Sequence, residues 1–183
     1  MTHYTADEIK NNDEGWLFYD SAFKCWKEIY NNIIGQDVLD IGCASGTMLA
    51  LTAIFNPSLK LTGYEIEKNA KEMWIRRKLT VKSGLLSDVP DKSFDTVYTS
   101  HVLEHCENPQ YIINDSIRLA RKRIIHVVPD GNVDDRNFGS PHLHIFNRKN
   151  FMTLFQHKTT KQVLYKSITD THISSIIAVY DVK

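Results

Sequence analysis

The nonapeptide VLDIGCASG, residues 38–46, joins a short apolar strand to the start of a helix through a turn of small residues. Gly42 permits a sharp bend and a close approach by a ligand because it has no Cβ atom. Gly46 permits close packing of the helix that we expect over residues 47–55. Asp40 stands near the end of the strand, where its carboxylate can orient the loop or receive an ammonium group. An ordinary strand-to-helix turn does not need consecutive small residues throughout, so the pattern indicates a loop that binds a ligand.

Strands and helices alternate on both sides of this unit. Aromatic residues recur every three or four positions over residues 16–34, as on one face of a helix, and Gly35 ends that helix. The other predicted strands are residues 59–65, 79–82, 94–99 and 123–128, and the other predicted helices are residues 68–78, 108–122 and 147–157. Two β-rich runs, residues 161–168 and 173–182, follow as an antiparallel pair. Parallel strands need crossovers, so the pattern predicts an α/β fold: a doubly wound, mostly parallel seven-stranded sheet with an antiparallel last strand.

Composition and charge narrow the classes of protein that the chain can belong to. It has 183 residues, 22 Lys plus Arg and 22 Asp plus Glu, so a general polyanion binder is excluded and no nucleic-acid partner is expected. The cationic run Arg118, Arg121, Lys122 and Arg123 is interpreted as a helix C-terminus. Three separated cysteines without a CxxC motif, a polar N-terminus and no long apolar stretch predict a cytoplasmic protein without a membrane partner.

The carboxyl end of the second predicted strand carries an acid. Sheets of this kind bind ligands at the carboxyl ends of their strands, and a carboxylate at Glu65 can bind both hydroxyls of a ribose. Ile66 would then lie against the flat base. A dinucleotide site typically reads GxGxxG, but Ala44 stands at the middle glycine here, which disfavours NAD. The two sites together predict an adenosine-type ligand.

The chain resembles the class I S-adenosylmethionine-dependent methyltransferases. VLDIGCASG resembles their first motif, and GYEIEKNA, residues 63–70, resembles their acidic second-strand motif. SGLLSDVPDKSFDTVYTSHVLEHCENP, residues 83–109, is similar to the family's run through the fourth strand, and HLHIFNRKNF, residues 142–151, to the segment after the fifth. The similarity is greatest to the small-molecule subgroup that includes quinone-biosynthesis methyltransferases. It implies a Rossmann-like methyltransferase fold in a single domain, 1–183, with 1–35 as an N-terminal helical cover and 36–183 as the core.

The resemblance also implies the cofactor, S-adenosyl-L-methionine, and the residues that hold it. The expected cofactor-binding residues are Asp40, Gly42, Cys43, Gly46, Glu65, Ile66, Leu85, Leu86 and Ser100. The loop that contains Gly42 would hold the methionine end of the cofactor. Glu65 would bind its ribose, and Leu85 and Leu86 would pack on its adenine. Ser83 or Ser87 stands where many members of the family have an acid that contacts adenine. Trp16 or Tyr19 of the N-terminal helix is a candidate for the pocket lining.

The resemblance implies methyl transfer by in-line displacement to a small or accessible acceptor, for which a base is needed only if the acceptor is protonated. The candidate bases are His101, His105 and His144, with Asp130 and His142 near the same expected mouth. His101 and His105 also have a spacing that two metal ligands use, with Glu104 and Cys106 close by, but we interpret the site as free of metal. The alternatives are a non-catalytic module that binds S-adenosylmethionine and, less favoured, an NAD(P)-dependent oxidoreductase. The oligomeric state is not determined by the sequence.

Overall fold

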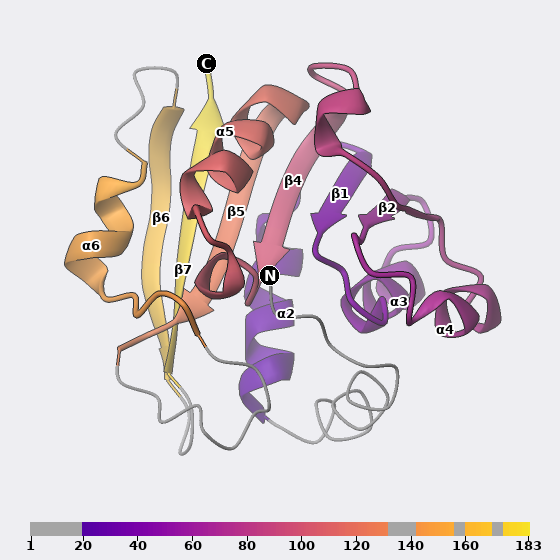
Figure 1. Cartoon of the computed structure of the whole chain (residues 1–183), viewed down its shortest axis with the longest axis horizontal. Helices are drawn as coiled ribbons and strands as arrows, with labels where there is room; N and C mark the ends of the chain where they lie inside the picture. The colour runs from indigo at the N-terminus through magenta and orange to yellow at the C-terminus, as the bar shows by residue number, and fades with distance from the viewer. Residues whose placement is uncertain (1–19, 132–141, 156–159, 170–173) are drawn as a thin grey trace.

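A computed structural model describes residues 20–131, 142–155, 160–169 and 174–183 of the chain (Figure 1). Its helices are α2 (Asp20–Asn32), α3 (Thr47–Phe55), α4 (Lys71–Arg76), α5 (Pro109–Leu119) and α6 (Arg148–Thr153), with short 3₁₀ helices η1 (Leu86–Asp88) and η2 (Leu103–His105). Its strands are β1 (Asp37–Ile41), β2 (Lys60–Tyr64), β3 (Val81–Lys82), β4 (Phe94–Ser100), β5 (Ala120–Pro129), β6 (Thr160–Thr169) and β7 (Ser174–Val182). No helix among the described residues is long and apolar enough to cross a bilayer.

The seven strands form one sheet in the order β3-β2-β1-β4-β5-β7-β6. The neighbours from β3 to β5 are parallel, whereas β7 is antiparallel to both β5 and β6. The predicted doubly wound, mostly parallel sheet with an antiparallel last strand is therefore confirmed. The chain reverses its strand order between β1 and β4, and the carboxyl ends of these strands share one edge of the sheet.

Helices cover both faces of the sheet, with α5 and α6 in front and α2 behind in the view of Figure 1. Successive strand residues enter opposite cores: Leu39 and Val97 pack in the cluster that includes Phe151 of α6, whereas Val38 packs with Trp26 of α2. A strand buried on both faces needs apolar residues in sequence rather than in alternation. The described part of the N-terminal helix is thus core structure, while Trp16 and Tyr19, expected to line the pocket, lie outside the described residues.

Two predicted helix ends are corrected by the structure. The helix predicted to reach residue 122 ends at Leu119, and Arg121, Lys122 and Arg123 belong to β5. They are therefore not a helix C-terminus; Arg121 and Arg123 bind aspartates across the sheet instead. The helix predicted over residues 68–78 is shorter, because Lys78 takes a left-handed conformation with φ of 56° after α4.

The predicted cap of α6 is confirmed. The Asn147 side chain accepts hydrogen bonds from the N–H groups of Lys149 and Asn150, and the Asn150 side chain accepts one from the N–H of Asn147. Reciprocal bonds of this kind satisfy donors that the first turn of a helix leaves without partners. The helix ends at Thr153, so residues 154 and 155 of the predicted extension are not helical, and the rest of that extension lies outside the described residues.

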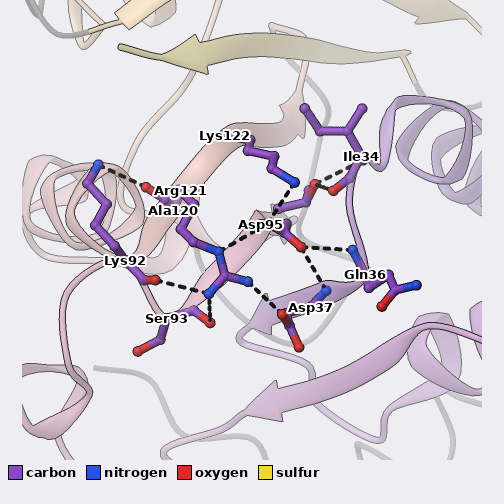
Figure 2. A network of polar contacts seen from close by, with 10 residues as sticks. Ile34, Gln36, Asp37, Lys92, Ser93, Asp95, Ala120, Arg121 and Lys122 are labelled. Atoms are coloured by element: carbon purple, nitrogen blue, oxygen red, sulfur yellow. Dashed lines mark hydrogen bonds and ion pairs between the residues drawn. The ribbon is translucent and has the colours of Figure 1, made fainter.

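A polar network joins the amino ends of β1, β4 and β5 (Figure 2). The buried Asp95 carboxylate accepts hydrogen bonds from the Gln36 and Asp37 N–H groups at 2.9 and 3.3 Å and from Arg121 Nε at 3.0 Å. Lys122 Nζ lies 3.1 Å from the same carboxylate. Arg121 also donates to Asp37 Oδ2 at 2.6 Å. These bonds hold the end of the sheet opposite the predicted ligand edge.

Candidate active site

The predicted ligand edge is formed by the loops that follow β1, β2, β3, β4 and β5. In the sheet register Ile41, the last residue of β1, lies beside Tyr64 of β2 and Thr99 of β4. The loops that leave these three strands therefore begin side by side. Each loop carries residues that the sequence placed in the cofactor site, which brings segments far apart in the chain to one place.

The loop after β1 bends at Gly42, which has a φ of 74°. Its N–H group donates to the carbonyl of Tyr64 at 2.7 Å, so the loop is bonded to the end of β2. A Cβ atom at Gly42 would lie 2.5 Å from Cγ2 of Val102, in the loop after β4. Both the backbone conformation and the close approach of Val102 therefore require glycine here. At Gly46, with φ of 80°, a Cβ atom would overlap Leu79.

The acid after β2 contacts this loop directly. One carboxylate oxygen of Glu65 accepts the N–H of Ala44 at 2.8 Å, and the other accepts the N–H of Glu67 at 3.1 Å. Ala44 has a φ of 45°, which turns its N–H group toward the acid within a tight turn. The two sites inferred separately from sequence, the small-residue loop and the acid, are thus parts of one constellation.

Helix α4 supports the loop from its other side, which sequence reasoning missed. Trp74 Nε1 donates to the carbonyl of Ala44 at 2.7 Å. Arg77 Nη1 donates to the Ser45 carbonyl and to Thr47 Oγ1, both at 2.9 Å. The only sequence signal was an indole and a guanidinium on one predicted helix, and nothing local indicated that they reach a loop some 30 positions earlier.

Asp40 lies beneath the loop and is buried, with 3% of its surface exposed. The hydroxyl of Tyr98 donates to its Oδ2 at 2.9 Å. Burial raises the pKa of Asp40 well above its usual range; the Tyr98 hydrogen bond opposes that shift and the negative charge of Glu65 adds to it. Burial also raises the pKa of the Cys43 thiol, which leaves that residue a packing group rather than a nucleophile. The Tyr98 hydroxyl therefore orients the Asp40 side chain.

Apolar side chains are exposed beside the acid. Ile66 after β2 is 52% exposed and Leu85 after β3 is 65% exposed, whereas Leu86 packs partly against the core. The hydroxyl of Tyr64 donates to the carbonyl of Leu85 at 2.8 Å and fixes this loop to β2. Large exposed apolar groups beside polar ones suit a flat aromatic ligand. Ser83 is partly exposed and Ser87 is exposed in the same loop.

The candidate bases separate into two groups. His101, with φ of 55°, lies between the hydroxyls of Ser100 and Ser175, each 3.2 Å from a ring nitrogen. Burial, together with the nearby His142 and His105 rings, lowers the pKa of His101 to about 4. The structure thus brings His101, His105 and His142 into one neighbourhood.

His144 and Asp130 make other contacts. His144 Nε2 lies 3.3 Å from the carbonyl of Glu107, and its ring stacks on Phe146 with centroids 6.0 Å apart. The N–H of Asp130 donates to the Ser174 carbonyl at 2.8 Å, which fixes the end of β5 beside β7. His144 is therefore placed by its surroundings as part of the wall at residues 142–146 rather than within the histidine group.

A buried histidine that sequence reasoning did not single out lies on β5. His126 Nδ1 is 2.8 Å from Thr99 Oγ1, and the ring packs against Phe155. Burial lowers the pKa of His126 to about 3. His126 is therefore neutral in the folded protein, whereas an unfolded chain protonates it near the ordinary histidine pKa of about 6.5.

We expect the free energy of unfolding to fall as the pH drops below about 6.5, because the unfolded state then binds more protons at His126 and His101. Each group contributes a slope of up to about 1.4 kcal/mol per pH unit between its unfolded and folded pKa values. Urea unfolding followed by tryptophan fluorescence at several pH values measures that slope. His126→Gln should reduce it by about half; a variant with the wild-type slope would show that His126 does not titrate in this way.

Comparisons with known proteins agree with this geometry. A family model described as a methyltransferase domain matches residues 13–178. A search of curated proteins found no match. Among solved structures, an S-adenosylmethionine-dependent methyltransferase from Aquifex aeolicus aligns with a TM-score of 0.75 at 14% identity, covering 99% of this chain and 100% of that one. Magnesium protoporphyrin IX methyltransferase from Synechocystis PCC 6803, solved with bound S-adenosylhomocysteine, aligns with a TM-score of 0.69 at 15% identity, covering 100% and 89%.

A third structure is the complex of the Haloferax volcanii Trm112 methyltransferase activator with a methyltransferase described as putative, which aligns with a TM-score of 0.77 at 14% identity over 100% of this chain and 99% of that one. At these identities the solved structures establish the fold. The family model covers most of the chain and sets aside the oxidoreductase alternative. The chain therefore belongs to the methyltransferase domain family.

Proposed function

We propose that the chain, acting as a single domain, transfers a methyl group from S-adenosylmethionine to a small or otherwise accessible acceptor. The observation that carries the proposal is the bond between the Glu65 carboxylate and the N–H of Ala44 at 2.8 Å. It joins the acid that suits a ribose to the glycine loop that suits the rest of the cofactor. When bound, the cofactor supplies a methyl group already activated on a sulfonium sulfur.

The binding residues follow from the constellation. Carboxylate oxygens accept more than one hydrogen bond each, so Glu65 can bind ribose hydroxyls while it holds the loop. The exposed side chains of Ile66 and Leu85, together with Leu86, would pack on the adenine. Gly42, Cys43, Gly46 and Ser100 would surround the methionine end, with Asp40 and Tyr98 supporting the loop from beneath.

The protein's remaining task is to orient the acceptor for in-line displacement and to exclude water. For an acceptor that carries a proton, His101 is the base that the geometry favours over His105 and His144. Its pKa of about 4 keeps the ring unprotonated at neutral pH, and the Ser100 and Ser175 hydroxyls hold its orientation. The same low pKa makes His101 a weak base, which suits an acceptor whose proton is already acidic.

Glu65→Ala should weaken binding of S-adenosylhomocysteine by about 1–3 kcal/mol, because a charged hydrogen-bond acceptor is lost. Isothermal titration calorimetry measures the change, and Glu67→Ala, which removes a neighbouring carboxylate, is the matched control with an affinity close to that of the wild type. Equal affinities for wild type and Glu65→Ala would remove Glu65 from the ribose site. Binding without methyl transfer to any of a broad panel of acceptors would instead identify a non-catalytic module.

A further inference from the structure

A group of ligating side chains lies beside the cofactor loop, on η2 and on the segment that begins at residue 142. Glu104, His105 and His142 each offer one ligand atom, and these atoms lie within 4.8 Å of one another. We propose that Glu104, His105 and His142 form a binding site for a divalent transition-metal ion of the zinc class. The proposal does not depend on the proposed methyl transfer, since it concerns the binding of an ion alone.

The backbone holds the two halves of the set together. The carbonyl of Glu104 accepts the N–H of Leu143 at 2.8 Å and the N–H of His144 at 3.1 Å. These two bonds fasten the residue after His142 to η2, although some 40 positions of chain separate them. Backbone hydrogen bonds therefore hold Glu104 and His142 near each other before any ion binds.

The side chains themselves are close to a ligating arrangement. The rings of His105 and His142 meet edge to face with centroids 4.7 Å apart, and His105 Nε2 lies 4.0 Å from Glu104 Oε1. Ligand atoms on a tetrahedral ion with bonds of about 2.0–2.1 Å are about 3.4 Å apart. The two histidine rings are partly exposed and can rotate to make that contraction, while Glu104 is buried.

The charges favour a dication at this point. Glu104 has no exposed surface, and burying a carboxylate is costly unless positive charge or donors compensate it. A dication bound by the Glu104 carboxylate would supply positive charge at this buried position.

The donor types indicate which ions the site selects. Two imidazole nitrogens and one carboxylate oxygen form the set of many zinc sites with an open position, and the same set binds iron(II) in other proteins. Magnesium and calcium prefer oxygen ligands and would bind more weakly. Val102, two residues before Glu104, is the side chain that approaches Gly42, so the ion would lie near the cofactor loop.

The test uses the whole chain after removal of metal with a chelator. Titration with Co²⁺, followed by its visible absorption, should show one equivalent bound at a site with nitrogen and oxygen ligands, and Zn²⁺ should displace it. His142→Asn and His105→Asn should each lower the affinity for Zn²⁺ at least about tenfold. His144→Asn is the matched control: it removes an imidazole two residues away that contacts Glu107 instead, and it should stay within about twofold of the wild type.

Glu104→Gln should lower the affinity as well, with circular dichroism to verify that this buried position still allows folding. If Glu104→Gln does not fold, the His105→Asn and His142→Asn variants still test the site. Failure to bind one equivalent of Co²⁺ or Zn²⁺ would overturn the site. The site would also be overturned if His144→Asn lowered the affinity for Zn²⁺ as much as His142→Asn does, because the effect would then not be specific to the proposed ligands.

Discussion

Gly42→Ala is expected to lower the affinity for S-adenosylhomocysteine about 100-fold, because the loop that holds the cofactor can no longer keep its shape. A side chain at a φ of 74° costs about 1–2 kcal/mol. The new Cβ atom would also lie 2.5 Å from Val102 Cγ2, and such overpacking adds about 1–3 kcal/mol. A total of about 3 kcal/mol corresponds to that loss if the loop moves away to relieve it.

Gly131→Ala separates the cost of the backbone conformation from the cost of the close contact. Gly131 has nearly the same φ, 75°, but nothing lies within 4 Å of an added Cβ atom. It should lose stability through the backbone conformation alone and keep its affinity for S-adenosylhomocysteine. Adding Val102→Ala to Gly42→Ala should recover part of the affinity by removing the contact. Calorimetry on the four proteins tests this, and wild-type affinity in Gly42→Ala would place the cofactor elsewhere.

Asp95→Ala should lower the free energy of unfolding by about 3 kcal/mol and leave the residues of the candidate active site unchanged. It removes a charged acceptor from Arg121 and leaves the N–H groups of Gln36 and Asp37 without that partner. A hydrogen bond to a charged group contributes about 1.5–3 kcal/mol, so the expected loss corresponds to one or two such bonds. It is not larger because Gln36 is exposed and Asp37 partly exposed, so that their N–H groups can bind water, and because Arg121 retains Asp37. Urea unfolding measures the loss.

Asp91→Ala is the control for this variant. Asp91 also binds an arginine, Arg118, at 2.7 Å, but 70% of its side chain is exposed, and pairs of that kind contribute about 0–1 kcal/mol. Arg121 holds the pKa of Asp95 well below its usual range. The stability from Asp95 is therefore present above about pH 4 and is lost as the pH falls further, so the two variants should converge in acid. Equal losses at neutral pH would contradict the role given to the buried network.

The sequence predicts this fold well where structure depends on local pattern. The strand, glycine turn and helix around VLDIGCASG, the Asn147 cap and the closing antiparallel pair all appear at or near the expected positions. The boundary between α5 and β5 was predicted three residues too late, because the cations at 121 and 122 resemble a helix end. The partners of Arg121, Asp37 and Asp95, are distant in sequence, so no local pattern could reveal that the strand begins before residue 123.

In the candidate site too, the residues that follow a local pattern could be predicted and those that depend on distant contacts could not. Gly42 and Glu65 could be found because each follows a strand whose position in the sheet is predictable. Trp74, Arg77 and Tyr98 could not, because their contacts with the loop arise only when α4 and β4 pack beside β1. The approach of His142 to His105 depends on the Glu104 carbonyl, which gathers two backbone donors from a remote segment.

The position of β7 has a consequence for how the sheet is completed. Strand β6 precedes β7 in the chain, yet it reaches the rest of the sheet only through β7, which lies between it and β5. During synthesis β6 leaves the ribosome first and must wait for a later segment before it gains a hydrogen-bonding neighbour. Strand β7 must also pair with β5, and Pro129 and Ser175 in that pair are far apart in the chain. Long-range pairing is slow and leaves unpaired strand edges exposed to other chains. The nascent protein therefore passes through a stage in which five strands can be in place and an aggregation-prone edge on β5 is open.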